Sequence, residues 1–289
     1  MDRIVDVTGG KGGNAFLILG ERKTALIDCG MAYCAGQLIN NIRQVLAARS
    51  LDFILISHSH YDHIGAIPYL KGTWPDTRVL GAEYAMRILN RQNALQTIKD
   101  LGRQAALLYG AAMPAEYDNA LLKVDQCLYD GDMLELGGLR ITVLATKGHT
   151  QCSLSFMLSN GTLFPSETTG YMSKAGVVYP GFITSYTDAI DSIYKCRAAN
   201  PRFIISPHLG LLSAAEAAGY WDKCLTAIGD TRKFILGLFA QGYTNEEILT
   251  AYEKNFRDEE SRLEQPFSAF ALNAQGMIKT VLKTKRLLT

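Results

Sequence analysis

The stretch His58-Ser59-His60-Tyr61-Asp62-His63 decides the fold of this chain. It directly follows Asp52–Ile56, an apolar run with the length of a buried strand. Three imidazoles and a carboxylate within six residues are costly to bury without a metal ion or other partners, and both groups are ligands that zinc and similar cations prefer. The stretch therefore predicts a metal site at a strand end. In it, the first two histidines face one ion, and Asp62 and His63 can face a second.

Strands and helices alternate around this stretch. Apolar runs at 16–19 and 24–27 flank Gly20-Glu21-Arg22, a pattern typical of a hairpin. Residues 37–48 carry apolar side chains at helical spacing. The order strand, helix, strand predicts a sheet covered by helices. Further strands are expected at 4–7, 134–136, 139–144, 154–158, 162–164 and 203–206.

Two helical regions are expected in addition. Residues 83–126 form a long insertion with helical periodicity, which we expect Gly102 and Pro114 to break into pieces. The chain from Ala214 onward also has a helical pattern, with Thr244-Asn245-Glu246-Glu247 as a capped helix start. We therefore expect one domain over residues 1–212 and a C-terminal helical extension over 213–289.

Composition excludes several classes of protein. The 289 residues are 48% hydrophobic and 20% charged, which excludes global disorder. A net charge of +1 gives no long-range attraction to nucleic acid or anionic membranes. No apolar signal segment is visible at the N-terminus, and the longest apolar runs have only strand length. The six cysteines include no CxxC pair and indicate reduced thiols. We expect a cytoplasmic protein without nucleic-acid or membrane partners.

The HxHxDH stretch resembles the signature of the metallo-β-lactamase superfamily. Gly148-His149-Thr150 resembles that family's next histidine turn, and Thr162–Glu167 resembles its strand that ends in an acidic residue. Ile204–His208 resembles its last histidine segment, and Leu26–Gly30 its strand with a supporting aspartate, here Asp28. The resemblance covers about residues 4–210. It implies an α/β fold, a four-layer αββα sandwich, with the helical insertion and extension added to it.

The resemblance also implies a centre of two divalent metal ions. His58, His60 and His149 would hold one ion, Asp62, His63 and His208 would hold the other, and Glu167 would lie between them. The family usually has aspartate at the position of Glu167. The longer glutamate could displace the bridge between the ions, weaken the binding of one ion, or point away from the site. Zinc is expected first, with iron or manganese as alternatives. Such ions can hold a bridging water as hydroxide. Asp62 would orient this nucleophile or transfer a proton.

Several reactions fit such a centre. The insertion, the extension and Ile64–Leu70 resemble the quinolone-signal response thioesterases within the superfamily. Our first hypothesis is therefore hydrolysis of an acyl thioester, carried by coenzyme A or a carrier protein, in a biosynthetic or signalling pathway. The alternatives are a lactone or carboxyl-ester hydrolase with the same site, a regulatory binding protein with a vestigial site, and oxidative chemistry at an iron centre.

Other residues have open roles. Tyr171 and Tyr179 are expected at the mouth of the site, where they would bind an acyl group, or they are ordinary loop tyrosines. Gly9–Gly13 is a loop between strands or a mobile flap near the site. Ser57 is expected to form a hydrogen bond at a strand end. The aromatic residues of the extension are expected to pack between its helices, to form a homodimer interface or to line the substrate site. They are Phe234, Phe239, Phe267 and Phe270.

Overall fold

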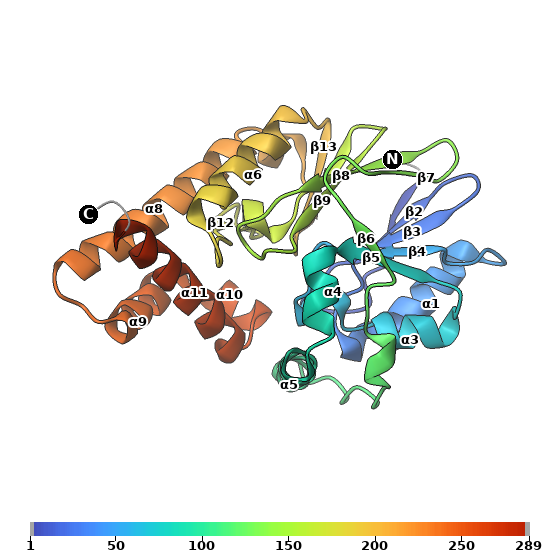
Figure 1. Cartoon of the computed structure of the whole chain (residues 1–289), viewed down its shortest axis with the longest axis horizontal. Coiled ribbons are helices and arrows are strands. Elements are labelled where there is room, and N and C mark those ends of the chain that lie inside the picture. Colours follow the sequence, from blue (N-terminus) through green and yellow to red (C-terminus); the bar gives the residue numbers. More distant parts are fainter. Residues whose placement is uncertain (1–2, 287–289) are drawn as a thin grey trace.

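Two six-stranded sheets form the centre of the molecule and are covered by helices on their outer faces (Figure 1). The computed structural model describes residues 3–286. The first sheet has the order β1-β2-β3-β4-β5-β6, and the second has the order β14-β13-β10-β9-β8-β7. The predicted four-layer αββα fold is thereby confirmed.

The first sheet begins as a hairpin and continues as a parallel sheet. Its strands are β1 (Ile4–Asp6), β2 (Phe16–Leu19), β3 (Thr24–Ile27), β4 (Phe53–Leu55), β5 (Arg78–Ala82) and β6 (Gln126–Leu128). Strands β2 and β3 pair antiparallel, whereas β3 to β6 pair parallel. Parallel neighbours need crossover connections, which here carry α1 (Ala35–Leu46) and α3 (Ile67–Thr73).

The second sheet is mostly antiparallel. Its strands are β7 (Met133–Glu135), β8 (Arg140–Ala145), β9 (Leu154–Leu158), β10 (Thr162–Phe164), β13 (Phe203–Ser206) and β14 (Gly210–Leu211). Only β10 and β13 pair parallel, through a crossover that contains α6 (Tyr186–Ala198). Together with α8 (Tyr220–Ala240), α6 covers this half of the molecule (Figure 1).

The inner faces of the two sheets share one apolar core. Ile18 and Leu55 of the first sheet belong to the same buried cluster as Ile141 and Phe156 of the second. Phe16 and Phe164 meet across the sheets with ring centroids 5.5 Å apart. This packing fixes the two sheets relative to each other, and with them the loops at their edges.

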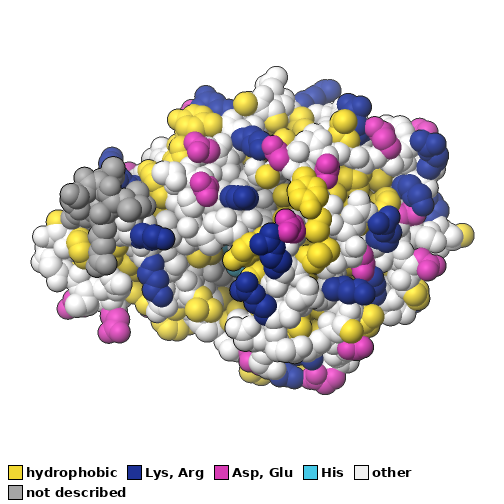
Figure 2. Space-filling model, in the orientation of Figure 1, with side chains coloured by type: hydrophobic (Ala, Val, Ile, Leu, Met, Phe, Trp, Pro, Cys, Tyr) yellow, Lys and Arg dark blue, Asp and Glu magenta, His cyan; other side chains and the backbone are white. Residues whose placement is uncertain are grey.

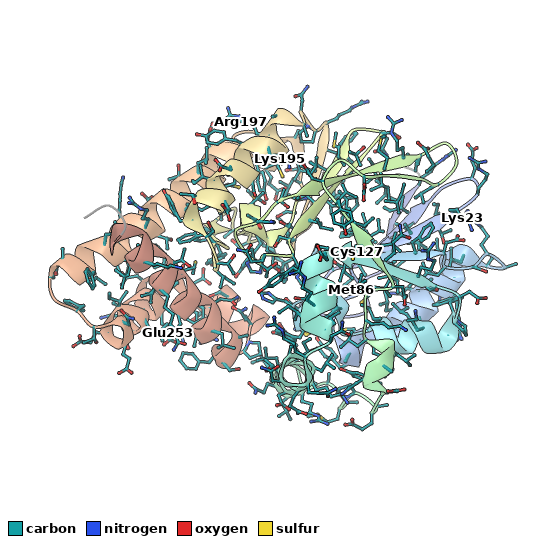
Figure 3. All side chains as sticks on the ribbon, in the orientation of Figure 1. Lys23, Met86, Cys127, Lys195, Arg197 and Glu253 are labelled. Atoms are coloured by element: carbon teal, nitrogen blue, oxygen red, sulfur yellow. The ribbon has the colours of Figure 1, made fainter. Side chains whose placement is uncertain are left out.

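The insertion forms two helices, α4 (Glu83–Leu89) and α5 (Gln92–Leu108), and the short helix η2 (Asn119–Leu121). The prediction that Gly102 breaks the helix is wrong, because α5 runs through it. A glycine costs a helix only about 1 kcal/mol, and the apolar face that includes the buried Leu95 and Ile98 outweighs this cost. In Figure 3 Met86 of α4 lies beside Cys127 of β6, with their sulfur atoms 3.8 Å apart.

The C-terminal extension is helical as expected. It comprises α7 (Ala214–Ala217), α8, α9 (Asn245–Phe256), α10 (Glu259–Glu264) and α11 (Phe267–Arg286). The predicted cap is confirmed, because the Thr244 hydroxyl accepts from the backbone N–H of Glu247. Helix α11 folds back toward the insertion (Figure 1), where the Ser268 hydroxyl donates to the Gln104 side chain of α5.

The surface carries charges of both signs. On the face shown in Figure 2, Lys and Arg side chains are interspersed with Asp and Glu. The six cysteines form no disulfide. Within residues 3–286, no helix combines the length and the apolar character that a membrane crossing requires.

Candidate metal centre

Loops at one edge of both sheets bring the five histidines together. The hexapeptide leaves the carboxyl end of β4, and its last three residues, Asp62 and His63 among them, belong to the short helix α2 (Tyr61–Ile64). His149 lies between β8 and β9, Glu167 begins the short helix η3 (Glu167–Thr169) after β10, and His208 lies between β13 and β14. Each sheet therefore contributes part of the site.

The first cluster consists of His58, His60, His149 and Glu167, whose ligand atoms lie within 4.8 Å of one another. His149 Nε2 is 3.0 Å from His60 Nδ1 and 3.0 Å from Glu167 Oε2. The Nε2 atom of His58 is buried and has no hydrogen-bond partner in the described structure. An unpaired buried nitrogen is costly, and a bound cation would satisfy it.

The second cluster consists of Asp62, His63, Glu167 and His208. Glu167 Oε1 lies 2.7 Å from both His63 Nε2 and His208 Nε2. Asp62 Oδ2 is 3.6 Å from His63 Nε2 and 3.9 Å from His208 Nε2. Glu167 thus directs one carboxylate oxygen to each cluster and does not point away from the site.

The donor set fits divalent cations. His149 Nδ1 lies 2.7 Å from the carbonyl oxygen of Gly181, and His63 Nδ1 lies 2.8 Å from Asp28 Oδ2. Each acceptor holds a proton on Nδ1 and leaves the Nε2 lone pair directed into its cluster, the arrangement usual for histidines that bind metals. Imidazole and carboxylate donors without thiolate suit zinc, iron and manganese. Cys152 is buried outside both clusters, with its sulfur 3.4 Å from the Ser59 hydroxyl.

Asp28 supports the site from beneath. One oxygen accepts from the backbone N–H of Ser57 and the other from its hydroxyl, each at 2.7 Å. Ser57 is therefore the hydrogen-bonding residue that its position at a strand end predicts. Asp28 (φ 54°) and His208 (φ 63°) both adopt the left-handed region, which is uncommon outside glycine. Such strained residues often cluster at functional sites.

Two imidazoles of the first cluster, those of His58 and His60, have lowered pKa values and are held neutral. Burial, reinforced by the neighbouring imidazoles, lowers the pKa of His58 well below its usual range. Burial also lowers the pKa of His60, to about 3. Because neutral imidazole is the form that binds a cation, both side chains are ready to bind one at neutral pH.

In the second cluster, the pKa values of the histidines are raised instead of lowered. Burial acts to lower the pKa of His63, but the carboxylates of Asp28, Asp62 and Glu167 outweigh it and raise the pKa well above its usual range. Burial is likewise outweighed at His208, whose pKa is raised mainly by Glu167. Burial raises the pKa of Asp62. The pKa of Glu167 is held well below its usual range, because the surrounding imidazoles overcome the effect of burial.

A network of buried hydroxyl groups holds the Glu167 loop. The Thr168 hydroxyl donates to the carbonyl of Thr146 at 2.6 Å and accepts from the backbone N–H of His149 at 3.2 Å. The hydroxyl of Ser166 lies 3.0 Å from that of Thr146. These contacts join the loops that carry His149 and Glu167, so the bridging carboxylate has a fixed support.

A pocket opens directly above the clusters. Its cavity volume is about 250 Å³, and it reaches His60, Asp62, Glu167 and His208. Its remaining wall comes from four parts of the chain. These are Tyr61 of α2, Thr97 and Leu101 of α5, Tyr171 and Ile183 from the segment after Glu167, and the end of the chain, with Gln265 just after α10 and Ala269, Leu272 and Asn273 within α11. The residues of the insertion and of α11 carry no recognisable sequence motif. The residues of α5 reach the site because this helix packs against α2, and those of α11 reach it because α11 folds back toward α5.

The two tyrosines singled out from the sequence have different positions. Tyr171 lines the pocket and packs its ring against that of His208, with centroids 5.0 Å apart. Tyr179 stacks behind Tyr171 at 5.1 Å, and its hydroxyl donates to Asp258. Tyr171 therefore faces the pocket, whereas Tyr179 is not among its lining residues. Phe234 and Phe270 of the extension pack against Tyr252.

Comparisons with known proteins agree with this arrangement. A model of the metallo-beta-lactamase superfamily matches residues 8–208. The metallo-beta-lactamase fold-containing protein ST1585 of Sulfurisphaera tokodaii is 24% identical over 204 residues, 68% of this chain and 73% of that protein. A hydroxyacylglutathione hydrolase of Photobacterium profundum is 30% identical over 119 residues, 41% of this chain and 33% of the hydrolase.

The likeness extends to solved structures. The metallo-beta-lactamase family protein TTHA1429 of Thermus thermophilus has a TM-score of 0.65 at 18% identity, and the match covers 99% of this chain and 94% of that one. At this identity the likeness concerns the fold. The chain spans less than half the length of several other curated relatives that it matches.

Proposed function

Because the chain belongs to the metallo-β-lactamase superfamily, we propose that it is a metal-dependent hydrolase of acyl thioesters. The observation that carries this proposal is Glu167, whose two carboxylate oxygens face two separate clusters of imidazole and carboxylate donors. A carboxylate in this position can join two cations in one centre. Two divalent ions, when bound, supply Lewis acidity and an activated water at neutral pH.

The residues of the chain have separate roles in this proposal. His58, His60 and His149 would hold one ion, and Asp62, His63 and His208 would hold the other, with Glu167 between the two groups. The Asp62 carboxylate, buried beside the pocket, would orient the attacking water and accept its proton. Tyr171 and the wall formed by α5 and α11 hold the acyl group. Zinc is the expected metal, with iron or manganese as alternatives.

The reaction is a hydrolysis without net redox change. The oxygen of water forms a bond to the acyl carbon, the bond from that carbon to sulfur breaks, and the thiolate leaves and takes up a proton. The products are a carboxylic acid and a free thiol. No serine or cysteine nucleophile is required, in keeping with the absence of Cys152 from both clusters.

Two observations support a thioester as the substrate. The matched hydrolase of Photobacterium profundum acts, by its name, on hydroxyacylglutathione, which is a thioester. In addition, α5 and α11 add a wall to the pocket that a bulky acyl group would contact. We propose acyl groups linked to coenzyme A or to a carrier protein as the substrate class.

The test is release of thiol from a panel of aliphatic and aromatic acyl thioesters. The protein is loaded separately with zinc, iron(II) and manganese, and its metal content is measured. We expect turnover with at least one metal, and loss of turnover and of bound metal in His60→Ala. Lys233→Gln, on the exposed surface of α8, should leave both unchanged. If metal is bound but only matched lactones or oxygen esters are cleaved, the thioester proposal is wrong.

A further inference from the structure

We propose that the pocket above the clusters selects an acyl group that carries an uncharged hydrogen-bonding group, a hydroxyl or keto oxygen, beyond the reacting carbonyl. The side-chain amides of Gln265 and Asn273, which line the pocket, are the specificity-determining groups. This inference rests on the proposed function and deepens it, because it names the class of acyl group that the hydrolase prefers.

Away from the ligand clusters, much of the pocket wall is apolar. Leu101, Ile183, Ala269 and Leu272 contribute side chains that form no hydrogen bonds. No Lys or Arg is among the described residues that line the pocket, and both of its carboxylates belong to the ligand clusters. The wall therefore offers an acyl group apolar surface and no cation to pair with a negative charge.

Two amides interrupt this apolar wall. Gln265 and Asn273 both line the pocket. Within residues 3–286, neither side-chain amide forms a hydrogen bond with another residue, although the backbone of Gln265 does. Each amide offers both donors and an acceptor. The pair can therefore bind a ligand group that accepts a hydrogen bond, as a keto oxygen does, or one that also donates, as a hydroxyl does.

Asn273 has a cost that the fold of the chain does not offset. It lies in the interior of α11, where asparagine is a poor helix former because its amide competes for backbone hydrogen bonds. Ala269, four residues earlier, lies on the same face of the helix and is small, which leaves room beside the amide. A residue that conflicts with its local structure and has no partner in the protein points to a functional role.

The backbone of Gln265 is held from two sides. Its carbonyl accepts from Arg257 Nη2 at 2.9 Å, and its N–H donates to the carbonyl of Ser261 at 3.2 Å. The Arg257 guanidinium also lies over the rings of Phe267 and Phe270, 5.3 and 5.0 Å from their centroids. Arg257 thus ties the segment after α10 to the start of α11. These contacts fix the point from which the Gln265 amide enters the pocket.

A matched series of acyl groups on one thiol separates recognition of the acyl group from recognition of the thiol. Hexanoyl-coenzyme A has no hydrogen-bonding group beyond the reacting carbonyl. The 3-hydroxyhexanoyl and 5-oxohexanoyl thioesters each have one, at different distances from that carbonyl. The preference is the ratio of kcat/KM for a polar acyl group to kcat/KM for hexanoyl.

The variants remove each amide and keep the approximate size of the side chain. Asn273→Leu and Gln265→Met are compared, singly and together, with the metal-loaded wild-type protein. Asn273→Gln retains an amide at the same position. The matched control is Gln275→Met, which replaces an exposed amide of α11 outside the pocket.

We expect the wild-type protein to prefer at least one of the polar acyl groups over hexanoyl. Each variant without an amide should lower this preference about threefold to tenfold, the effect of one lost hydrogen bond, and the double variant should lower it further. The kcat/KM for hexanoyl should stay close to the wild-type value in every variant. Asn273→Gln should keep part of the preference, and Gln275→Met should keep all of it.

A wild-type protein without the preference, a preference that survives in the double variant, or an equal loss with all three thioesters would overturn the inference. Absence of turnover with every thioester would instead overturn the proposed function. In that case, calorimetric titration of the three free acids into the same proteins decides. Tighter binding of a polar acid than of hexanoate, lost in the double variant, supports selection by the amides, whereas equal binding of the three acids, or none, excludes it.

Discussion

At the scale of single residues, the function of the site depends on side chains that do not face the ions. Asp28 accepts three hydrogen bonds, two from Ser57 and one from His63, and so fixes both the strand end and one imidazole. Its carboxylate lies behind His63 and also contributes to the raised pKa of that side chain. A carboxylate that accepts a hydrogen bond from the other ring nitrogen of a metal-binding histidine sets the orientation and the basicity of that imidazole.

Asp28→Asn is expected to lower metal affinity or activity by about 10–100-fold. Asparagine tolerates the left-handed backbone that Asp28 adopts, so the fold should persist while the charge is lost. Metal content after dialysis and the rate of thiol release give the result. Asp6→Asn, an exposed aspartate that caps a turn, is the matched control. A variant with wild-type metal content and rate would show that the Asp28 charge is dispensable.

The two clusters should respond differently to pH. The raised pKa values of His63 and His208 mean that both are protonated below those values in protein stripped of metal. A cation must displace these protons, so affinity at the second cluster rises with pH and levels off above the raised pKa values. His60, with a pKa of about 3, and His58, with a lower pKa than usual, have no proton to lose at neutral pH.

Calorimetric titration of zinc into the stripped protein tests this difference. Buffers with different ionisation enthalpies reveal the protons released on binding. We expect one binding step that releases protons and weakens as the pH falls from 8 to 6, and another with little pH dependence. Two steps with the same pH dependence would contradict the assignment.

At the scale of elements, α11 matters most because it forms a wall of the pocket above the clusters. It contacts the loop after β12 (Val178–Tyr179) through Gly276 and Thr280. A Cβ atom at Gly276 would lie 2.3 Å from Cγ2 of Ile183, and the Thr280 hydroxyl donates to the carbonyl of Ile183. Because Ile183 also lines the pocket, this contact couples the position of the helix to the shape of the site.

Gly276→Ala should destabilise the protein by roughly 1–3 kcal/mol, since the added methyl group overpacks against a stiff β-branched side chain. The matched control is Gly229→Ala in α8, where a Cβ atom would contact nothing within 4 Å. There the better helix propensity of alanine should stabilise the protein by about 0.5–1 kcal/mol. Chemical denaturation measures both values, and the same sign of change in the two variants would refute the close contact.

How far the sequence predicts these elements depends on how local their signals are. Four of the candidate ligands fall in one hexapeptide, so their chemistry is visible without the fold. Thr244 carries its own capping signal, and the helix begins there. By contrast, no expectation from the sequence covers α6, whose apolar face is weakly defined, although Ser185 caps it through the backbone N–H of Asp188.

The pocket wall lies beyond such local reasoning. Gln265 and Asn273 gain their roles only because α11 returns to the edge of the sheets, after more than a hundred residues of intervening chain from His149. From the sequence, the direction of the Glu167 side chain could not be predicted, because glutamate is longer than the aspartate usual in the family. The structure places it between the clusters because the hydroxyl network of Thr146, Ser166 and Thr168 sets the course of its loop.

At the scale of the whole molecule, metal and stability should be linked. Ions that bind the folded clusters and not the unfolded chain add about 2.7 kcal/mol of stability per site at a metal concentration 100 times Kd. For a chain of this size, removal of both ions with a chelator should lower Tm by about 5–20 °C. Differential scanning fluorimetry with and without chelator, followed by zinc add-back, measures this. A Tm that does not depend on metal would show that neither cluster binds an ion in the folded state.

Both clusters draw donors from both sheets. The first half of the chain supplies His58, His60, Asp62 and His63, and the second supplies His149, Glu167 and His208. If the chain were divided between β6 and β7, neither fragment would hold a complete site. Metal ions would then stabilise the association of the two fragments, and this association would be measured as recovered enzymatic activity. During synthesis on the ribosome, likewise, both clusters are complete only after His208 has left the ribosome. Two metal ions can therefore bind only late in synthesis.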